Sequence, residues 1–310
     1  MKGNATPRQD RLDVVAIALV TLLCALWGVQ QVTVKVAIAG GLPPLLQGTL
    51  RHAGAATLVA CFVLVRQGAP GVRALFRRDA ATWPGLLIAV LFALEFIALF
   101  PGLSLTTASR AVIFLYTAPF FTALGAHFFV PGERFRLRQV IGLLIAFAGV
   151  AAAFADGLVA GGGSVTGDLL CLAAGVFWGA TTVVVKASPG LQRSPPAKLL
   201  FFQLAGSAPM MLAVSLLAGE HVAWGAVSTL AWAGLFYQTV VVAFASYLAW
   251  IWLVLAYPAG RLAGFTFLTP LFGALAGALL LGEHVGLALL VGLAAIAVGL
   301  PLLNSKGRTP

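Results

Sequence analysis

Residues 26–37 read LWGVQQVTVKVA, and residues 177–188 read FWGATTVVVKAS. In both stretches a Trp-Gly pair is followed by six residues and a lysine, and the surrounding sequence is apolar. The two tryptophans are 151 positions apart, which is close to half the chain. A lysine in apolar sequence is costly unless it reaches water or a partner. A motif that places a lysine in apolar sequence at two equivalent positions therefore indicates a duplicated structural unit.

The composition of the whole chain agrees with a membrane location. Of the 310 residues, 61% are hydrophobic and only 9% are charged, and the mean hydropathy is +1.01. A soluble domain carries about 25% charged residues. The composition therefore excludes an ordinary water-soluble protein.

Ten apolar runs are long enough to cross a bilayer, which takes about 20 residues for about 30 Å of hydrocarbon. They fall near 13–39, 44–65, 82–101, 106–130, 138–155, 167–187, 197–218, 227–250, 260–281 and 286–303. The sequence thus predicts an all-α integral membrane protein with ten transmembrane helices. Only Pro258 and Gly260 separate the eighth run from the ninth, so nine or eleven spans stay open as alternatives.

Basic residues in the connectors indicate the orientation, because cytoplasmic connectors retain Lys and Arg. Fourteen lie in alternate connectors: Lys2, Arg8, Arg11, Arg66, Arg73, Arg77, Arg78, Arg134, Arg136, Arg138, Arg193, Lys198, Lys306 and Arg308. The opposite connectors contain none. We therefore expect both termini in the cytoplasm. The same rule accounts for the net charge of +10, so we expect no nucleic-acid partner.

Motifs for chemistry are absent from the sequence. It contains no HExxH, GxSxG or Walker loop, and its four histidines lack ligand spacing. Cys24, Cys61 and Cys171 lie within spans, where we expect them to pack as small apolar residues. We expect no enzymatic activity, no cofactor and no metal site. The first run lacks a cleavage site and should be retained in the mature protein.

The offset of 151 extends beyond the opening motif. It relates seven pairs: Trp27 and Trp178, Lys35 and Lys186, Ala108 and Ala259, Arg110 and Arg261, Phe114 and Phe265, Pro119 and Pro270, Phe121 and Phe272. We therefore divide the chain into two homologous halves, 1–155 and 156–310. Five runs per half make the second half enter the membrane from the opposite side. Inverted repeats of this kind are a recurring transporter design.

Two longer segments carry a family resemblance: ASRAVIFLYTAPFFTAL (108–124) and AGRLAGFTFLTPLFGAL (259–275), each followed by a Gly-Glu pair. With the Trp-Gly pair that opens each half, they resemble the drug/metabolite transporter superfamily. More narrowly, the chain is similar over its whole length to the ten-helix EamA-type exporters. The resemblance implies a proton-linked or facilitated exporter of small metabolites in a bacterial inner membrane. Amino-acid exporters of the YddG kind are the favoured branch.

Candidate substrate-pathway residues follow from helical spacing, since positions four apart lie on one stripe. The stripes Trp27, Gln31, Lys35 and Trp178, Thr182, Lys186 are expected to line a central cavity. The alternative is that the tryptophans pack between helices while the lysines extend to water. The further pathway candidates are Gln30, Arg51, Glu95, Tyr116, Phe120, Tyr237, Gln238 and Tyr247.

Charges inside the spans form the second set of candidates. Lys35, Arg110, Lys186 and Arg261 are expected near the membrane interfaces. Glu95 is the only carboxylate well inside a span, and it is either ion-paired with Arg51 or Arg110, a proton site, or a contact for a substrate amine. Asp168, at the start of the sixth run, is predicted to be a helix cap.

Pro119 and Pro270 lie in mid-span at equivalent positions, where proline kinks a helix. They are either gating points or fixed kinks that shape the cavity. Together these features predict a carrier, expected to be monomeric in the bilayer, that exports apolar or aromatic amino acids by alternating access. The alternatives are a multidrug exporter of lipophilic cations and a channel-like facilitator.

Overall fold

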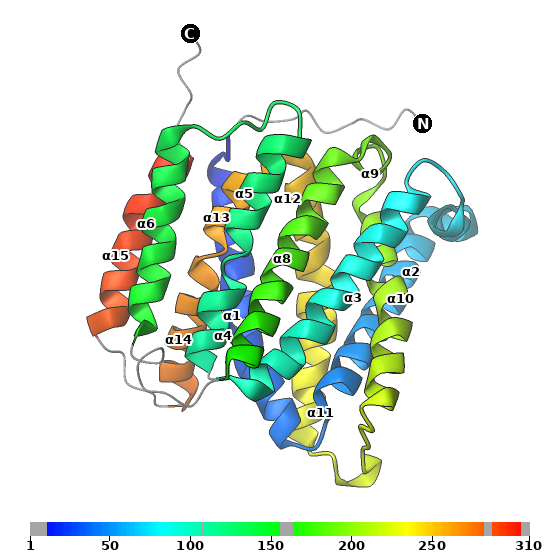
Figure 1. Cartoon of the computed structure of the whole chain (residues 1–310). Coiled ribbons are helices and arrows are strands. Elements are labelled where there is room, and N and C mark those ends of the chain that lie inside the picture. Colours follow the sequence, from blue (N-terminus) through cyan, green and yellow to red (C-terminus); the bar gives the residue numbers. More distant parts are fainter. Residues whose placement is uncertain (1–10, 107, 156–163, 282–286, 305–310) are drawn as a thin grey trace.

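The computed structural model describes residues 11–106, 108–155, 164–281 and 287–304, and the regular structure in these ranges is helical (Figure 1). The elements are α1 (Val14–Ala39), α2 (Pro44–Phe76), α3 (Thr82–Leu105), α4 (Ala108–Leu115), α5 (Ala118–Phe129), α6 (Leu137–Ala153), α8 (Val165–Ala187), α9 (Pro189–Gln192), α10 (Pro196–Leu217), η1 (Trp224–Ala226), α11 (Thr229–Phe236), η2 (Tyr237–Ser246), α12 (Tyr247–Ala256), α13 (Ala259–Phe265), α14 (Leu268–Leu281) and α15 (Leu287–Leu303).

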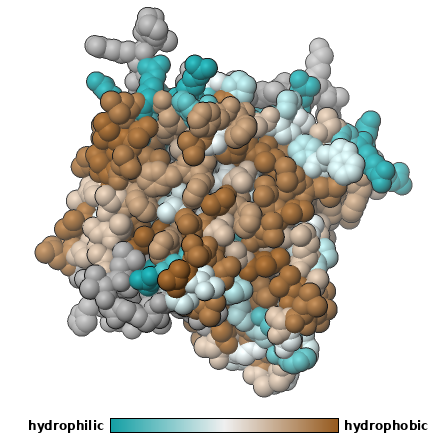
Figure 2. Space-filling view, viewed as in Figure 1, coloured by the Kyte–Doolittle hydropathy of each residue, from teal (hydrophilic) through white to brown (hydrophobic). Residues whose placement is uncertain are grey.

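Eight helical stretches in the described ranges are long and apolar enough to cross a membrane, and α6 and α15 add two shorter apolar helices. The α4–α5 pair, the α11–α12 run and the α13–α14 pair each contribute one such stretch. The face in Figure 2 is apolar across its middle, while hydrophilic side chains gather toward its ends. The molecule is therefore a multi-pass membrane protein.

Helices of the first half pack mainly on helices of the second half. α6 lies along α15, and α2 lies along α10 (Figure 1). α1 packs on α14 and on the α11–α12 run, and α8 makes the matching contacts with α5 and α3. Each contact thus recurs with the halves exchanged, as a two-fold relation between them requires.

The helix starts follow the same relation. Asp13 caps α1 by accepting a hydrogen bond from the N–H of Ala16 at 2.8 Å. Ser164, 151 positions later, caps α8 by accepting one from the N–H of Gly167 at 3.0 Å. Side-chain oxygens of Asp and Ser satisfy N–H groups that a helix start leaves unpaired. Corresponding residues therefore begin the two helices that carry the Trp-Gly pairs.

The glycine of each Trp-Gly pair lies at a helix crossing without room for a methyl group. A Cβ on Gly28 would lie 2.6 Å from the backbone nitrogen of Gly273 in α14. A Cβ on Gly179 would lie 2.8 Å from Cβ of Phe121 in α5. Small residues permit such close approach of helices in membranes. The repeated glycine is therefore explained by one crossing that occurs twice.

Two spans are interrupted just before their prolines. α4 ends at Leu115 and α5 begins at Ala118, so the break immediately precedes Pro119. α13 ends at Phe265 and α14 begins at Leu268, two residues before Pro270. Proline lacks an N–H and clashes with the carbonyl four residues earlier. The two breaks therefore occupy equivalent places in the halves.

Three predicted span ends differ from the structure. α3 ends at Leu105 instead of residue 101. α2 continues beyond residue 65 to Phe76, across a kink at Gly68, where φ is +68°. Glycine adopts this left-handed conformation readily. The eighth span ends at Ala256 instead of residue 250, because helix α12 continues to the turn at Tyr257 and Pro258.

An ion pair joins the α2–α3 connector to α10. Lys198 Nζ donates to Asp79 Oδ2 at 2.6 Å and to the carbonyl of Arg77 at 3.1 Å. The hydrogen bond from Lys198 lowers the pKa of the Asp79 carboxyl below its usual value of 3.8. The Lys198–Asp79 pair therefore adds to the free energy of unfolding. Its contribution is complete above the pKa that Asp79 has in the unfolded chain, and it is lost as the pH falls through the pKa that Asp79 has in the folded protein.

Asp79→Asn should therefore remove part of the acid sensitivity of folding. We expect the thermal midpoint of the wild type in detergent to fall more steeply below about pH 4 than that of the variant. Fluorescence-detected melts across pH 3–7 measure both slopes. Parallel slopes would contradict a stabilising role for this pair.

Candidate functional site

A cavity lies between the two halves, bounded by α1, α3, α8 and α12. It encloses about 860 Å³ of space between atoms, part of it open to solvent. Most of its wall is apolar: Trp27, Phe92, Phe96, Leu99, Leu115, Tyr116, Trp178, Val185, Tyr247, Trp250, Ile251 and Val254. Its other lining residues are Gln30, Glu95, Thr181, Thr182 and Gln203. Apolar walls with a few polar groups are typical of small-molecule sites.

The two repeated tryptophans both face this cavity. The Trp27 ring meets that of Trp250 edge-on at 5.4 Å between centroids, and Trp178 meets Tyr116 in the same way at 5.8 Å. Trp27 Nε1 donates to Ser246 Oγ at 2.8 Å. These contacts hold the indole rings in place, because aromatic pairs favour edge-to-face geometry and a buried indole N–H needs an acceptor.

The helix opposite Trp27 is irregular where it meets the cavity. The segment η2 has π-helical geometry, while the equivalent part of α3 is α-helical. π-Helical turns are rare and are frequent at functional sites. Ser246, which binds Trp27, is the last residue of η2, and Tyr247 follows it on the cavity wall. The irregular segment thus ends at the cavity.

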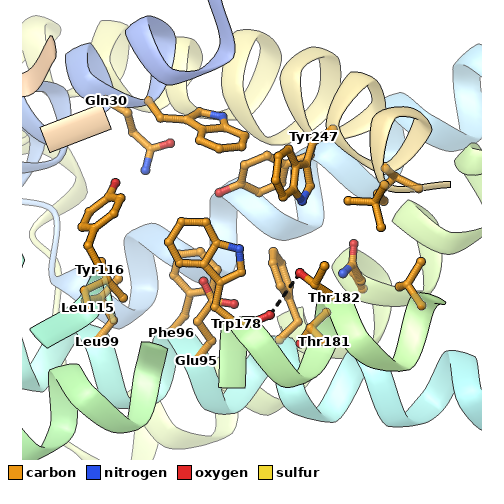
Figure 3. A pocket seen from close by; sticks show the side chains of 17 residues that line it. Gln30, Glu95, Phe96, Leu99, Leu115, Tyr116, Trp178, Thr181, Thr182 and Tyr247 are labelled. Carbon is orange, nitrogen blue, oxygen red and sulfur yellow. Dashed lines mark hydrogen bonds between the residues drawn. The ribbon is translucent and has the colours of Figure 1, made fainter. Parts of the chain in front are cut away.

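Glu95 lies on the wall contributed by α3. It is 8% exposed, and its Oε2 has no hydrogen-bond partner among the described residues. Figure 3 shows Glu95, Trp178 and Thr182 on one wall, with Gln30 and Tyr247 on the facing wall. The carboxylate therefore borders the space that a solute would occupy.

The positive charges predicted near Glu95 have other partners. Arg51 is 1% exposed and does not line the cavity; its guanidinium donates to the Tyr247 hydroxyl and lies 5.1 Å from the centre of the Phe96 ring. Arg110 binds Asp168. In the part of the chain that the structure describes, Glu95 forms an ion pair with neither arginine.

The prediction that Asp168 caps α8 is wrong, since Ser164 is the cap. Asp168 lies one turn further along, where it accepts hydrogen bonds from Thr106 Oγ1 at 2.7 Å and Arg110 Nε at 3.1 Å. Arg261, the repeat equivalent of Arg110, instead contacts Asn304 at 3.5 Å. Arg110 and Arg261 thus bind different partners in the two halves.

Neither expectation for Lys186 holds, since it is not among the residues that line the cavity and it does not extend to water. Its side chain is 1% exposed, and Nζ lies 3.3 Å from Oε1 of Glu133, which is 4% exposed. The other Glu133 oxygen accepts the N–H of Ala259 at 2.7 Å. A buried ammonium is stabilised by a carboxylate within reach, so the lysine pairs instead of extending. The side chains of Lys35 and Gln31 lie outside the described part of the structure.

Seven predicted pathway residues are among the described residues that line the cavity: Trp27, Gln30, Glu95, Tyr116, Trp178, Thr182 and Tyr247. The other candidates with described side chains do not line the cavity: Arg51, Phe120, Tyr237 and Gln238. The Tyr237 hydroxyl donates to the carbonyl of Leu26 at 3.0 Å. Thr181 and Trp250 were missed, although the repeat offset relates them to Gln30 and Leu99. Gln203 was also missed, since the sequence alone carries no sign that its face of α10 meets the cavity.

Comparisons with known proteins agree with this architecture. The model of the EamA-like transporter family matches residues 14–155 and again 165–305. The chain is 31% identical to the uncharacterized transporter YvbV of Bacillus subtilis (strain 168) over 294 residues, or 94% of this chain and 92% of that protein. It is 30% identical to a probable amino-acid metabolite efflux pump of Salmonella typhimurium (strain LT2) over 291 residues, covering 91% and 92%.

The fold is similar to that of a solved crystal structure. The TM-score is 0.75 at 19% sequence identity, and the match covers 93% of this chain and 98% of the other. The family model covers both halves, and each match contains one of the Trp-Gly pairs at the cavity. The chain belongs to the EamA-like transporter family.

Proposed function

We propose that the protein is a secondary transporter that exports small metabolites, namely apolar or aromatic amino acids, across the bacterial inner membrane. The observation that carries this proposal is the position of the cavity, which lies between the halves with Trp27 and Trp178 both on its wall. A site at the interface of two repeats suits alternating access, in which one set of helices rocks against another.

The membrane arrangement forms part of the proposal. Ten helical stretches, counting α6 and α15, would give five spans in each of the halves 1–155 and 156–310. An odd number inverts the second half. The start of α1 and the end of α15 lie together, since the N–H of Leu12 donates to Asn304 Oδ1 at 3.1 Å. If the connectors rich in Lys and Arg lie on the cytoplasmic side of the membrane, both termini are cytoplasmic.

The wall chemistry favours amphipathic solutes with an apolar body. Among the described residues, seven aromatic and five aliphatic side chains surround five polar ones. The Salmonella relative is named as an amino-acid metabolite efflux pump, which supports the same class of cargo here. The prolines at the two helix breaks would allow the α4–α5 and α13–α14 spans to bend during transport.

Uptake by the purified protein in liposomes tests this function. We expect uptake of labelled phenylalanine and tryptophan to saturate with concentration, with and without an imposed pH gradient. Protein-free liposomes measure the background. Uptake that stays at background for both amino acids at every concentration would contradict the proposed function.

Filling the cavity should block transport. Leu99 corresponds to Trp250 by the repeat offset, and both line the cavity. We expect Leu99→Trp to lower uptake about ten-fold or more, because the added ring occupies the substrate space. Leu86→Trp, on the same helix at a position 44% exposed, is the matched control and should transport normally. Equal uptake by both variants would place the pathway elsewhere.

A further inference from the structure

Glu95 is the one charged side chain among the described residues that line the cavity. More than nine-tenths of the residue is buried, and its Oε2 has no hydrogen-bond partner there. A buried carboxylate oxygen without a partner is costly. The cavity thus contains a carboxyl group whose missing contact a ligand can supply.

Arg51 does not supply that contact. Arg51 is held behind the wall between the rings of Phe96 and Tyr247, at 5.1 and 5.2 Å from their centres, and it donates to the Tyr247 hydroxyl. No ion pair joins it to Glu95 in the described ranges. A solute in the cavity therefore meets Glu95 and no cation on the described wall.

The other polar groups of the wall also favour a donor-rich ligand. The second buried wall atom without a partner is Gln30 Oε1, which is likewise an acceptor. The hydroxyls of Thr181 and Thr182 donate to the carbonyls of Phe177 and Trp178 at 2.8 and 3.3 Å, so their oxygens remain as acceptors. An ammonium group carries three donors and no acceptor. It is the group that these atoms complement.

Aromatic rings near Glu95 add to the preference for a cation. Phe96 is its neighbour in sequence, and Figure 3 shows the Trp178 ring beside it and Tyr247 across the cavity. Faces of such rings attract cations. A carboxylate on the ligand meets no cationic side chain on the described wall, only uncharged donors such as amide and hydroxyl groups.

We propose that Glu95 binds the ammonium group of the substrate, so that the cavity selects amphipathic amines whether or not they carry a carboxylate. This proposal rests on the proposed function, because it assumes that substrates enter this cavity. It narrows the substrate class to molecules with a primary amine and an apolar or aromatic body.

Three probes that differ in one group at a time test the proposal: phenylalanine, phenethylamine without the carboxylate, and 3-phenylpropionate without the amine. We expect the purified full-length protein in detergent to bind the first two, measured by titration calorimetry. We expect 3-phenylpropionate to bind about 10- to 100-fold more weakly, as the loss of a charged hydrogen bond implies. Binding of 3-phenylpropionate as tight as that of phenethylamine would overturn the proposal without any variant.

Variants test whether Glu95 causes the preference for ligands that carry an amine. Glu95→Gln should weaken binding of both amines about 10- to 100-fold and leave 3-phenylpropionate unchanged. Asp79→Asn is the matched control, since it makes the same change of acid to amide in a connector outside the cavity, and its affinities should equal the wild type. Wild-type affinity of Glu95→Gln for phenethylamine would overturn the proposal.

Binding and transport together separate the two proposals. Amine-selective binding without uptake in liposomes contradicts the transport function and leaves the Glu95 site standing. Saturable uptake of all three probes with equal affinity contradicts the Glu95 site and leaves the transport function standing.

Discussion

Lys186→Met is expected to destabilise the protein by about 3–5 kcal/mol, the usual cost of removing one partner from a buried ion pair. Lys186 and Glu133 are 1% and 4% exposed, so water cannot replace the lost ammonium. Glu133 would keep the N–H of Ala259 as a partner but would carry a buried charge without its counterion. Thermal unfolding in detergent, followed by tryptophan fluorescence, measures the loss.

Two further variants test the cause. The double variant Lys186→Met, Glu133→Gln should recover part of the stability, because it removes the buried charge as well. Lys198→Met is the matched control: its partner Asp79 is 41% exposed, so we expect a loss of at most about 1 kcal/mol. A Lys186→Met midpoint no lower than that of Lys198→Met would contradict a stabilising buried pair.

Gly28→Ala is expected to cost about 3 kcal/mol, the upper part of the range for overpacking a tight contact. The added Cβ would lie 2.6 Å from the nitrogen of Gly273 and 2.8 Å from the carbonyl carbon of Phe272. Both are backbone atoms, so no side-chain rotation relieves the clash and the α1–α14 crossing must open. The fraction of protein that elutes as a single folded species, together with its melting midpoint, reports the effect.

The same crossing supplies the control. A Cβ on Gly273 would lie 3.6 Å from the carbonyl oxygen of Gly28, an ordinary contact. Gly273→Ala should therefore melt close to the wild type. If the two alanine variants lose the same stability, the close approach of α1 and α14 is not what requires a glycine after Trp27.

Features repeated at a fixed offset could be predicted well from the sequence. The match of Trp27 with Trp178 and of Pro119 with Pro270 indicated two equivalent units, and the family matches to 14–155 and 165–305 confirm two repeats. Repetition is informative because a motif kept at one offset marks the same local structure twice.

Contacts between distant charges could not be predicted. Lys186 and Glu133 are each part of a repeated motif, yet they are brought together only because the turn after α5 packs against the end of α8. Asp168 had the position typical of a cap, but Ser164 binds the free N–H and leaves the carboxylate for Arg110. In both cases the partner is distant in sequence, so local rules give no sign of it.

The cavity wall was predicted in part for a related reason. Apart from Glu95, α3 is apolar on every side, so the rest of its sequence does not distinguish the face that meets the cavity from the face that meets lipid. Glu95 was identified as the one deep carboxylate, whereas its apolar neighbours Phe92 and Leu99 were missed. A polar residue in a span identifies the side of the helix that faces the cavity. Apolar residues face both lipid and cavity, so the sequence does not show which of them line the wall.

We propose that one cavity between the halves is exposed to the two sides of the membrane in turn, and a counterflow experiment tests this alternation. Liposomes containing the purified protein are loaded with unlabelled phenylalanine and diluted into a trace of labelled phenylalanine. A carrier that alternates predicts transient accumulation of label above its equilibrium level, followed by decay. Label that rises only to equilibrium, at a rate independent of the unlabelled amino acid inside, would contradict alternating access and indicate a channel-like pathway.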